Sequence, residues 1–373
     1  MTKKVSQHIG PLISLLTLLI IFIIYYGAAN LWMKYYASPV VHAKLVLNVH
    51  PKYGWYQIPN LKTSFYNSSL ITNSEGQRIG KENISTGKGK TILVLGPSSA
   101  FGWGVDFEST YGNKLTQLMT AKTGGPWQVI NLSGIGHSVI QGQKILEDVT
   151  PLLHPDLIIL AYGINDLDRF RFYFQSNEPD RMMFDHLDEK SLYQDSSPAP
   201  YAISQFAYEL QNQIRSRFFC QKIPIIDEFP NLRTPLSEFA KEWKDLIKMA
   251  QKFNVPIVTL GTTSSFPKKA RPTSLSADEY FAKAHRAQVN GDCHEYRENL
   301  TMALELESSR IEKDLIVLNR EEQKIAQEMN LLHLDLEEVF ANKKTAEYFL
   351  DPVHFTEKGH DIIAQRIFEK FSQ

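Results

Sequence analysis

Five short apolar runs, most of them separated by helical patterns, set the strongest limit on the fold of this 373-residue chain. They are Thr91–Leu95, Trp127–Ile130, Asp156–Tyr162, Val255–Leu260 and Leu331–Asp335. The first run does not alternate between apolar and polar residues, which is typical of a strand covered on both faces in a parallel sheet. Strands that alternate with helices predict an α/β domain with a parallel sheet.

The helical patterns between these runs include Leu236–Phe253 and Arg320–Met329. Thr234-Pro235 places a capping residue and an N1 proline directly before the first of these helices. The sequence therefore predicts where at least one helix of the α/β domain begins.

The N-terminal residues are predicted to lie outside this domain. An apolar run without charge extends from Ile9 to about Met33, and roughly 20 such residues cross a bilayer as a helix. A cleaved signal peptide has a shorter apolar region of ~7–15 residues, so we predict that 9–33 is an uncleaved transmembrane anchor. Lys3 and Lys4 precede the run and Lys34 follows it. This slight positive-inside bias predicts a cytoplasmic tail at 1–8 and an extracytoplasmic C-terminal part.

The rest of the chain is predicted to form two parts. Residues 34–90 are interpreted as a stalk and a β-rich segment, because turn signals separate short β-rich pieces. Residues 91–373 are predicted to form the α/β domain. This domain is expected to carry two insertions that a minimal α/β domain lacks, at about 167–233 and 276–318. The first is irregular and aromatic, and the second is a helical hairpin that begins with a capping box at Ser276.

The composition argues against several classes of function. The formal net charge of −1 does not favour a nucleic-acid partner. The chain has no zinc-ligand cysteine spacing, no Walker loop and no GxGxxG motif, so no metal and no cofactor is predicted. Cys220 and Cys293 either form a disulfide in an oxidising compartment or remain buried thiols.

Four polar stretches carry the residues of an acyl-transfer site. They are Gly96–Ser99, Asn131–Gly136, Gly163–Asp166 and Asp351–His354, and the first three follow predicted strands. Each of the first three stretches by itself is more often, or as often, an ordinary turn or loop, whereas Asp351–His354 also suits a helix N-terminus capped by Thr356, which does not compete with a catalytic role. Ligand sites of parallel sheets form at the carboxyl ends of the strands, so we expect these stretches to converge.

The residue types at these positions suit nucleophilic attack on an ester. Ser98 is the candidate nucleophile, His354 the base that takes its proton, and Asp351 the carboxylate that orients His354. The N–H groups of Ser98 and Gly136 and the neutral side-chain amide of Asn165 are candidate oxyanion donors. Asn165 alone is equally compatible with an Asx turn.

The four stretches together resemble the SGNH family of serine hydrolases, also called GDSL-type esterases. Gly163-Ile164-Asn165-Asp166 is similar to the family's Gly-x-Asn-Asp block, and Asp351-Pro352-Val353-His354 to its Asp-x-x-His block. The resemblance implies a three-layer α/β/α, flavodoxin-like hydrolase domain with Ser98, Asp351 and His354 as its triad. It implies an oxyanion hole formed by Ser98, Gly136 and Asn165. Pro97 departs from the family, which has Asp before the nucleophile.

We therefore expect a membrane-anchored serine esterase with its catalytic domain outside the cytoplasm. Its substrate is expected to be an ester-bearing small molecule, glycan or lipid. One alternative is an O-acyltransferase or deacetylase that modifies a cell-envelope polysaccharide, and another is a non-catalytic envelope binding or assembly factor. Phe170 and Phe172 either line the substrate pocket or belong to the core of the insertion.

Overall fold

The computed structural model describes residues 2–35, 43, 46–66, 68–81, 89–169, 179–185, 231–266 and 273–372. The contacts divide the chain into two units. One unit combines 1–46 with 195–223, and the other combines 47–194 with 224–373. The chemical stretches predicted from the sequence all belong to the second unit.

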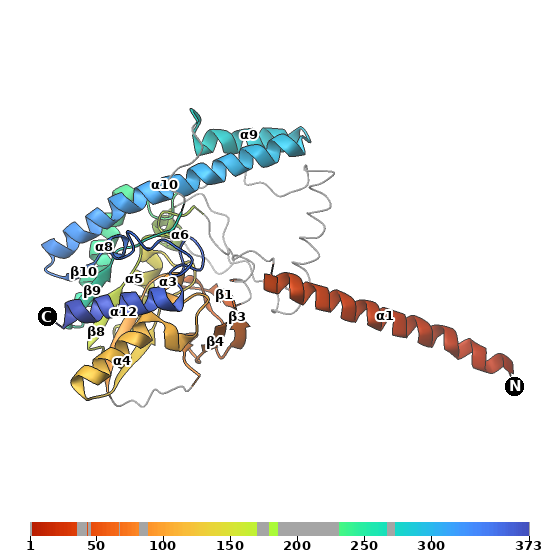
Figure 1. Cartoon of the computed structure of the whole chain (residues 1–373), viewed down its shortest axis with the longest axis horizontal. Helices are drawn as coiled ribbons and strands as arrows, with labels where there is room; N and C mark the ends of the chain where they lie inside the picture. The colour runs from red at the N-terminus through yellow and green to blue at the C-terminus, as the bar shows by residue number, and fades with distance from the viewer. Residues whose placement is uncertain are drawn as a thin grey trace. The chain divides into compact units, whose positions relative to one another are not determined.

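The first unit contains the long helix α1 (Thr2–Tyr35), which is red in Figure 1. The large apolar side chains from Ile13 to Ile24 are 49–66% exposed. The described side chains of α1 begin at Ile13. Among the residues whose side chains are described, no helix is both long and apolar enough to cross a membrane.

The second unit is built on an eight-stranded sheet with the order β10-β9-β8-β6-β7-β5-β4-β3. Five of its strands are parallel and coincide with the five apolar runs, which confirms those predictions. Taken in chain order, the five run 2-1-3-4-5 across the sheet, which is the flavodoxin-like arrangement. The strands of this sheet are β3 (Lys62–Phe65), β4 (Ser68–Thr72), β5 (Arg78–Ile79), β6 (Lys90–Leu95), β7 (Trp127–Asn131), β8 (Leu157–Leu160), β9 (Ile257–Leu260) and β10 (Leu332–Leu334).

The sequence predicted a parallel sheet, but the sheet is mixed, because three strands of the β-rich segment extend it in the antiparallel sense. Arg78 of β5 pairs with Asn131 of β7, and β4 and β3 follow as antiparallel neighbours. The strand pairing between β5 and β7 is limited to the one residue pair Arg78 and Asn131, at the carboxyl end of β7. A separate hairpin is formed by β1 (Leu47–His50) and β2 (Gly54–Gln57).

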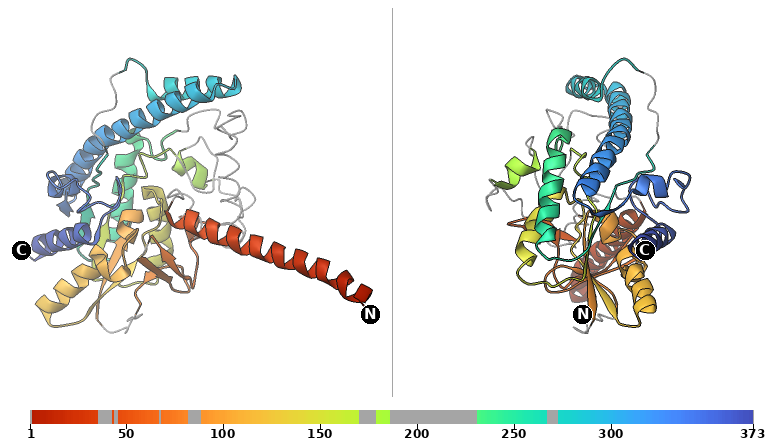
Figure 2. Two further views of the ribbon diagram at one scale, coloured as in Figure 1. Left: turned by 45° about the vertical axis from the view of Figure 1, so that its right-hand side comes forward. Right: turned by 90° about the vertical axis from the view of Figure 1, so that its left-hand side faces the viewer.

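Helices cover both faces of the sheet, which confirms the three-layer architecture. On one face, Ile92 and Val94 of β6 pack in a cluster with residues of α4 and α12. On the other face, Leu93 and Leu95 pack in a cluster with residues of α5, α8 and α10. The right-hand view of Figure 2 shows α4 and α12 on one side of the strands and α8 on the other. The five helices are α4 (Tyr111–Thr123), α5 (Val139–Val149), α8 (Leu236–Gln251), α10 (Cys293–Glu328) and α12 (Glu357–Phe371).

The second predicted insertion contains a helical hairpin. Helix α9 (Ala277–Val289) begins with the predicted capping box at Ser276 and lies alongside α10 (Figure 1). The sequence indicated a separate helix at 320–329, but α10 runs without a break from Cys293 to Glu328. Its later turns bury Leu315, Leu318 and Ile325 against the sheet.

Cys293, the first residue of α10, is disulfide-bonded. The chain has one other cysteine, Cys220, which lies outside the described residues. Phe170 and Phe172 also lie outside the described residues, so their predicted role in substrate binding stays a prediction.

The shorter helices of the second unit are α3 (Ser98–Phe101), η1 (Phe107–Ser109), α6 (Asp180–Asp185) and α11 (Leu336–Val339).

Candidate active site

Three residues that are far apart in the sequence form a continuous chain of hydrogen bonds. The Oγ atom of Ser98 lies 2.7 Å from Nε2 of His354, although the two residues are 256 positions apart. The Nδ1 atom of His354 lies 2.7 Å from Oδ2 of Asp351. This arrangement allows the imidazole to take the serine proton while the carboxylate orients the ring.

The turn after β6 displays Ser98 at the edge of the sheet. Pro97 is the N-cap of α3, with φ at −83°, and its carbonyl oxygen accepts hydrogen bonds from the N–H groups of Ala100 and Phe101 at 3.0 and 2.9 Å. The fixed φ of proline suits this position, because no hydrogen bond from its own nitrogen is needed. The N–H of Ser98 forms no hydrogen bond within the described part of the chain, as expected at a helix N-terminus.

The loop before α12 holds the other two residues of the relay. The Oδ1 atom of Asp351 accepts hydrogen bonds from the N–H groups of Val353 and His354, each at 2.9 Å. Burial opposes ionisation of Asp351, but the hydrogen bonds from His354 and Val353 prevail and hold its pKa below the ordinary value. Thr356 caps the following helix α12, because its hydroxyl oxygen accepts a hydrogen bond from the N–H of Gly359 at 3.3 Å.

The loop after β7 brings Gly136 to the strand beside the nucleophile. Gly136 has a φ of +72°, a left-handed conformation that favours glycine. A side chain at Gly134 would meet the ring of His137 at 2.0 Å, so the loop also requires glycine there. The N–H of Gly136 donates to no acceptor among the described residues and is available as a donor.

Asn165 follows β8, the other neighbour of β6, and its side chain crosses to the loop after β7. Its Nδ2 atom donates to the carbonyl oxygen of His137 at 3.0 Å. An amide nitrogen carries two hydrogens, so one remains for a further acceptor. The three candidate donors therefore come from the ends of three adjacent strands, with Ser98 on the central one.

Two buried titratable residues support these loops. Asp166 accepts hydrogen bonds from the N–H groups of Val139 and Gly163, each at 3.0 Å, and from the hydroxyl of Thr234 at 2.7 Å. Burial nevertheless raises the pKa of Asp166 to about 7. Burial lowers the pKa of His137 to about 3, so this imidazole is neutral and holds a structural position 3.1 Å from the carbonyl oxygen of Trp55.

Several residues at the site were not assigned a role from the sequence. Trp103 stacks on His354, with ring centroids 4.8 Å apart. Arg78 donates to the carbonyl oxygens of Phe101 and Gly102, the last residue and the C-cap of α3, at 2.8 and 2.5 Å. The sequence around Trp103, Phe101-Gly102-Trp103-Gly104, does not indicate what this side chain contacts. Trp103 packs against Phe65 of β3 and His354, and both contacts depend on the tertiary structure.

The described residues contain no group of three or more His, Cys, Asp or Glu side chains that is arranged to hold a metal ion. The groups that the described site presents are a hydroxyl, an imidazole, a carboxylate and neutral N–H donors.

Comparison with known proteins places this geometry in context. The profile of the family described as GDSL-like Lipase/Acylhydrolase matches residues 92–367. No curated protein sequence matches the chain. Solved structures similar to the chain include an acetylxylan esterase from Geobacillus stearothermophilus, with 15% identity over 77% of this chain and 95% of that one and a TM-score of 0.39. Another is a lipase/acylhydrolase from Enterococcus faecalis, with 14% identity over 76% and 95% of the two chains and a TM-score of 0.39.

Proposed function

The chain belongs to the GDSL-like lipase/acylhydrolase family and is an ester-bond hydrolase, and we propose that it acts as a serine esterase through Ser98, His354 and Asp351. One observation carries this proposal. The hydroxyl, the imidazole and the carboxylate are joined by two hydrogen bonds of 2.7 Å. Ser98 and His354 are only 7% and 6% exposed, which keeps the hydrogen bond between them largely shielded from water.

The reaction begins when Ser98 Oγ attacks the ester carbonyl carbon and His354 Nε2 takes the serine proton. A tetrahedral intermediate forms, and the C–O bond to the leaving alcohol breaks as His354 returns the proton to that oxygen. Water then attacks the acyl-enzyme, gives its proton to His354, and releases the acid with regeneration of Ser98. Asp351 remains ionised throughout and stabilises the imidazolium.

The negative oxygen of the tetrahedral intermediate is bound, in this proposal, by the N–H groups of Ser98 and Gly136 and by Nδ2 of Asn165. Each of the three has a hydrogen that is not used by the described residues. Donors that are already aimed at the developing charge need no reorganisation during the reaction. Pro97 leaves these three donors intact. The Ser98 N–H is present whether the residue before it is proline or aspartate.

The test uses the full chain, a nitrophenyl ester of a short acid and a fluorophosphonate probe. We expect hydrolysis by the wild type and loss of hydrolysis in Ser98→Ala, with labelling of Ser98 only in the wild type. Ser99→Ala is the matched control, because it removes a hydroxyl from the next residue of the same helix. Equal activity of Ser98→Ala and the wild type would refute the mechanism. Absence of both hydrolysis and labelling in the wild type would favour the non-catalytic alternative.

We also propose that α1 anchors the protein in a membrane and that the catalytic domain lies outside the cytoplasm. The uncharged apolar run from Ile9 to Met33 and the exposure of its large side chains support this proposal. Replacing Leu16 and Leu19 by Arg is expected to move the protein from the alkali-resistant membrane fraction to the soluble fraction, since each charge costs about 3 kcal/mol in the bilayer.

A reporter that is active only outside the cytoplasm, fused to the C-terminus, tests the orientation. We expect an active fusion, because Lys3 and Lys4 precede the run. An inactive fusion, with the same reporter active when it is fused to a control protein that faces outside the cytoplasm, would refute the proposed orientation while leaving the anchor itself intact.

The acceptor of the acyl group distinguishes hydrolysis from transfer. Acetylated sugars, peptidoglycan fragments and lipid esters form the substrate panel. Mass spectrometry then follows the acyl group either to water, as free acid, or to an added polysaccharide hydroxyl. We propose hydrolysis as the leading activity, and acylated polysaccharide as the main product would replace it with the acyltransferase alternative.

A further inference from the structure

The two peptide units on either side of Gly136 are each held from outside their loop. The carbonyl oxygen of Ile135 accepts a hydrogen bond from Nε1 of Trp55 at 2.8 Å. The carbonyl oxygen of Gly136 accepts a hydrogen bond from Nη1 of Arg233 at 2.5 Å. These two donors belong to segments that lie 80 and 97 positions away from their acceptors.

The first of these contacts controls the direction of a proposed oxyanion donor. The Ile135 carbonyl and the Gly136 N–H belong to one planar peptide unit, and in a trans unit they point in opposite directions. The described chain contains no cis peptide bond. By holding the Ile135 carbonyl on one side, Trp55 directs the Gly136 N–H to the other side.

The second contact removes the freedom that remains. Glycine at a φ of +72° has no side chain to restrict its backbone, so a loop held on one side only is able to rotate about Gly136. Arg233 holds the carbonyl of the next peptide unit. With both units held, φ and ψ of Gly136 have fixed values.

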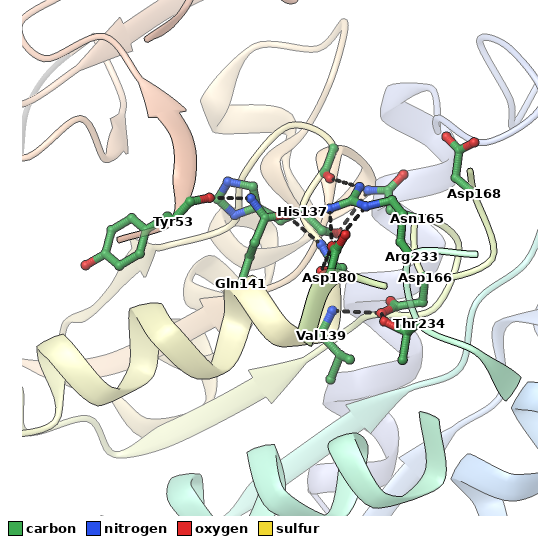
Figure 3. Close-up of polar contacts among 12 residues, drawn as sticks. Tyr53, His137, Val139, Gln141, Asn165, Asp166, Asp168, Asp180, Arg233 and Thr234 are labelled. Carbon is green, nitrogen blue, oxygen red and sulfur yellow. Dashed lines mark hydrogen bonds and ion pairs between the residues drawn. The ribbon is translucent and has the colours of Figure 1, made fainter. Parts of the chain in front are cut away.

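The group that holds Gly136 is itself rigid. The side chains of Trp55 and Arg233 are almost fully buried, at 0% and 1% exposure, and the guanidinium lies 5.1 Å above the indole ring. Figure 3 shows Arg233 beside Asp180, which accepts from its Nε and Nη2 atoms at 3.0 and 2.8 Å. The hydroxyl of Ser138 donates to the same carboxylate oxygen at 2.7 Å.

We propose that Trp55 and Arg233 are positioning residues that aim the Gly136 N–H at the oxyanion. This proposal rests on the serine esterase mechanism proposed above and adds to it. The donor itself comes from the loop after β7, whereas Trp55 belongs to the β1–β2 hairpin. Arg233 lies two residues before Pro235, the N-cap of α8. The orientation of one catalytic N–H therefore depends on two segments outside the parallel strands.

Trp55→Phe is the main test, because it removes the indole N–H and keeps an aromatic ring beneath Arg233. We expect kcat for a short-chain nitrophenyl ester to fall roughly 10- to 100-fold. This loss is smaller than the loss for complete removal of one oxyanion donor, because in the variant the Gly136 N–H is misdirected but still present. KM is expected to change less than about threefold, because the ground-state ester gains little from this donor. Arg233→Lys, which keeps the charge beside Asp180 but loses the guanidinium fork, is expected to act in the same direction.

A second readout is the affinity for an alkylboronic acid, which forms a tetrahedral adduct with Ser98 Oγ. Trp55→Phe is expected to weaken this inhibitor by about the same factor as kcat. Gln57→Met is the matched control. Gln57 is buried like Trp55, lies on the same strand and donates to the carbonyl oxygen of Ser133 in the same loop at 3.1 Å, but it does not hold either peptide unit of Gly136.

The outcomes separate the two proposals. An unchanged kcat in folded Trp55→Phe, with activity that still requires Ser98, would overturn the positioning role alone. An equal loss of kcat in Gln57→Met would also overturn it, because general order of the loop would then explain the effect. Hydrolysis by the Ser98→Ala variant at the wild-type rate would overturn both the proposed mechanism and the positioning role. Circular dichroism and melting temperature establish that each variant is folded.

Discussion

The imidazole of His354 lies parallel to the indole of Trp103, with ring centroids 4.8 Å apart and an angle of 14° between the planes. Phe65 of β3 packs edge-on against the same indole at 4.6 Å. An aromatic face attracts a cation. Trp103 therefore both sets the plane of the imidazole and lies where the proposed imidazolium forms after proton transfer from Ser98.

We predict that Trp103→Leu lowers kcat roughly 3- to 30-fold, which corresponds to a cation–π contribution of about 0.5–2 kcal/mol. Trp103→Phe is expected to lose less, since an aromatic face remains. Steady-state kinetics on a nitrophenyl ester provide the measurement, with melting temperatures to detect loss of packing. Equal kcat values for Trp103→Leu and the wild type would show that the stacked ring does not contribute.

Asn165→Ala is expected to lower kcat by about 10²–10³, the usual cost of one oxyanion donor. The loss should be smaller than that of Ser98→Ala, because the N–H groups of Ser98 and Gly136 remain. Asn165→Asp is a matched variant of the same size that brings a negative charge to the oxyanion, and we expect it to be less active than Asn165→Ala. A rise in KM with unchanged kcat would indicate instead that Asn165 binds the ground-state ester.

Asp351→Asn is predicted to lower kcat by about 10⁴, because an amide no longer selects the imidazole tautomer that presents a free Nε2 to Ser98. The lowered pKa of Asp351 also links it to stability. The carboxylate contributes stability above its unfolded pKa, and this contribution disappears as the pH falls through the lower folded value. Urea unfolding of the wild type and Asp351→Asn should therefore differ at neutral pH and converge in acid.

His137→Phe is predicted to weaken the pH dependence of stability below pH 6.5. The pKa of His137 falls from 6.5 to about 3 on folding, so between these values the unfolded chain binds a proton that the folded protein does not. Stability is then lost as the pH falls, by up to about 1.4 kcal/mol per pH unit for this one group. Urea unfolding between pH 6.5 and 5 measures the slope, which should be shallower in the variant. Parallel slopes would show that His137 titrates normally.

The parallel strands and the four chemical stretches were predictable from the sequence because both depend on local properties. A run such as Thr91–Leu95 has no polar face, so it must be covered on both sides wherever it lies. Glycine, asparagine and serine at strand ends are equally local signals. Their convergence followed from one general rule, that the carboxyl ends of parallel strands meet at one edge of the sheet.

The mixed sheet, the continuous helix α10 and the surroundings of the catalytic groups were decided only by the tertiary structure. No local pattern near Trp55 indicates that its indole N–H will meet Ile135, and none near Arg233 indicates that it will reach Gly136. Such contacts depend on how separate segments pack. The sequence by itself determined which groups are able to perform the chemistry. The packing of the β-rich segment, which contains Trp55, and of Arg233, at the end of the first insertion, decided how those groups are oriented.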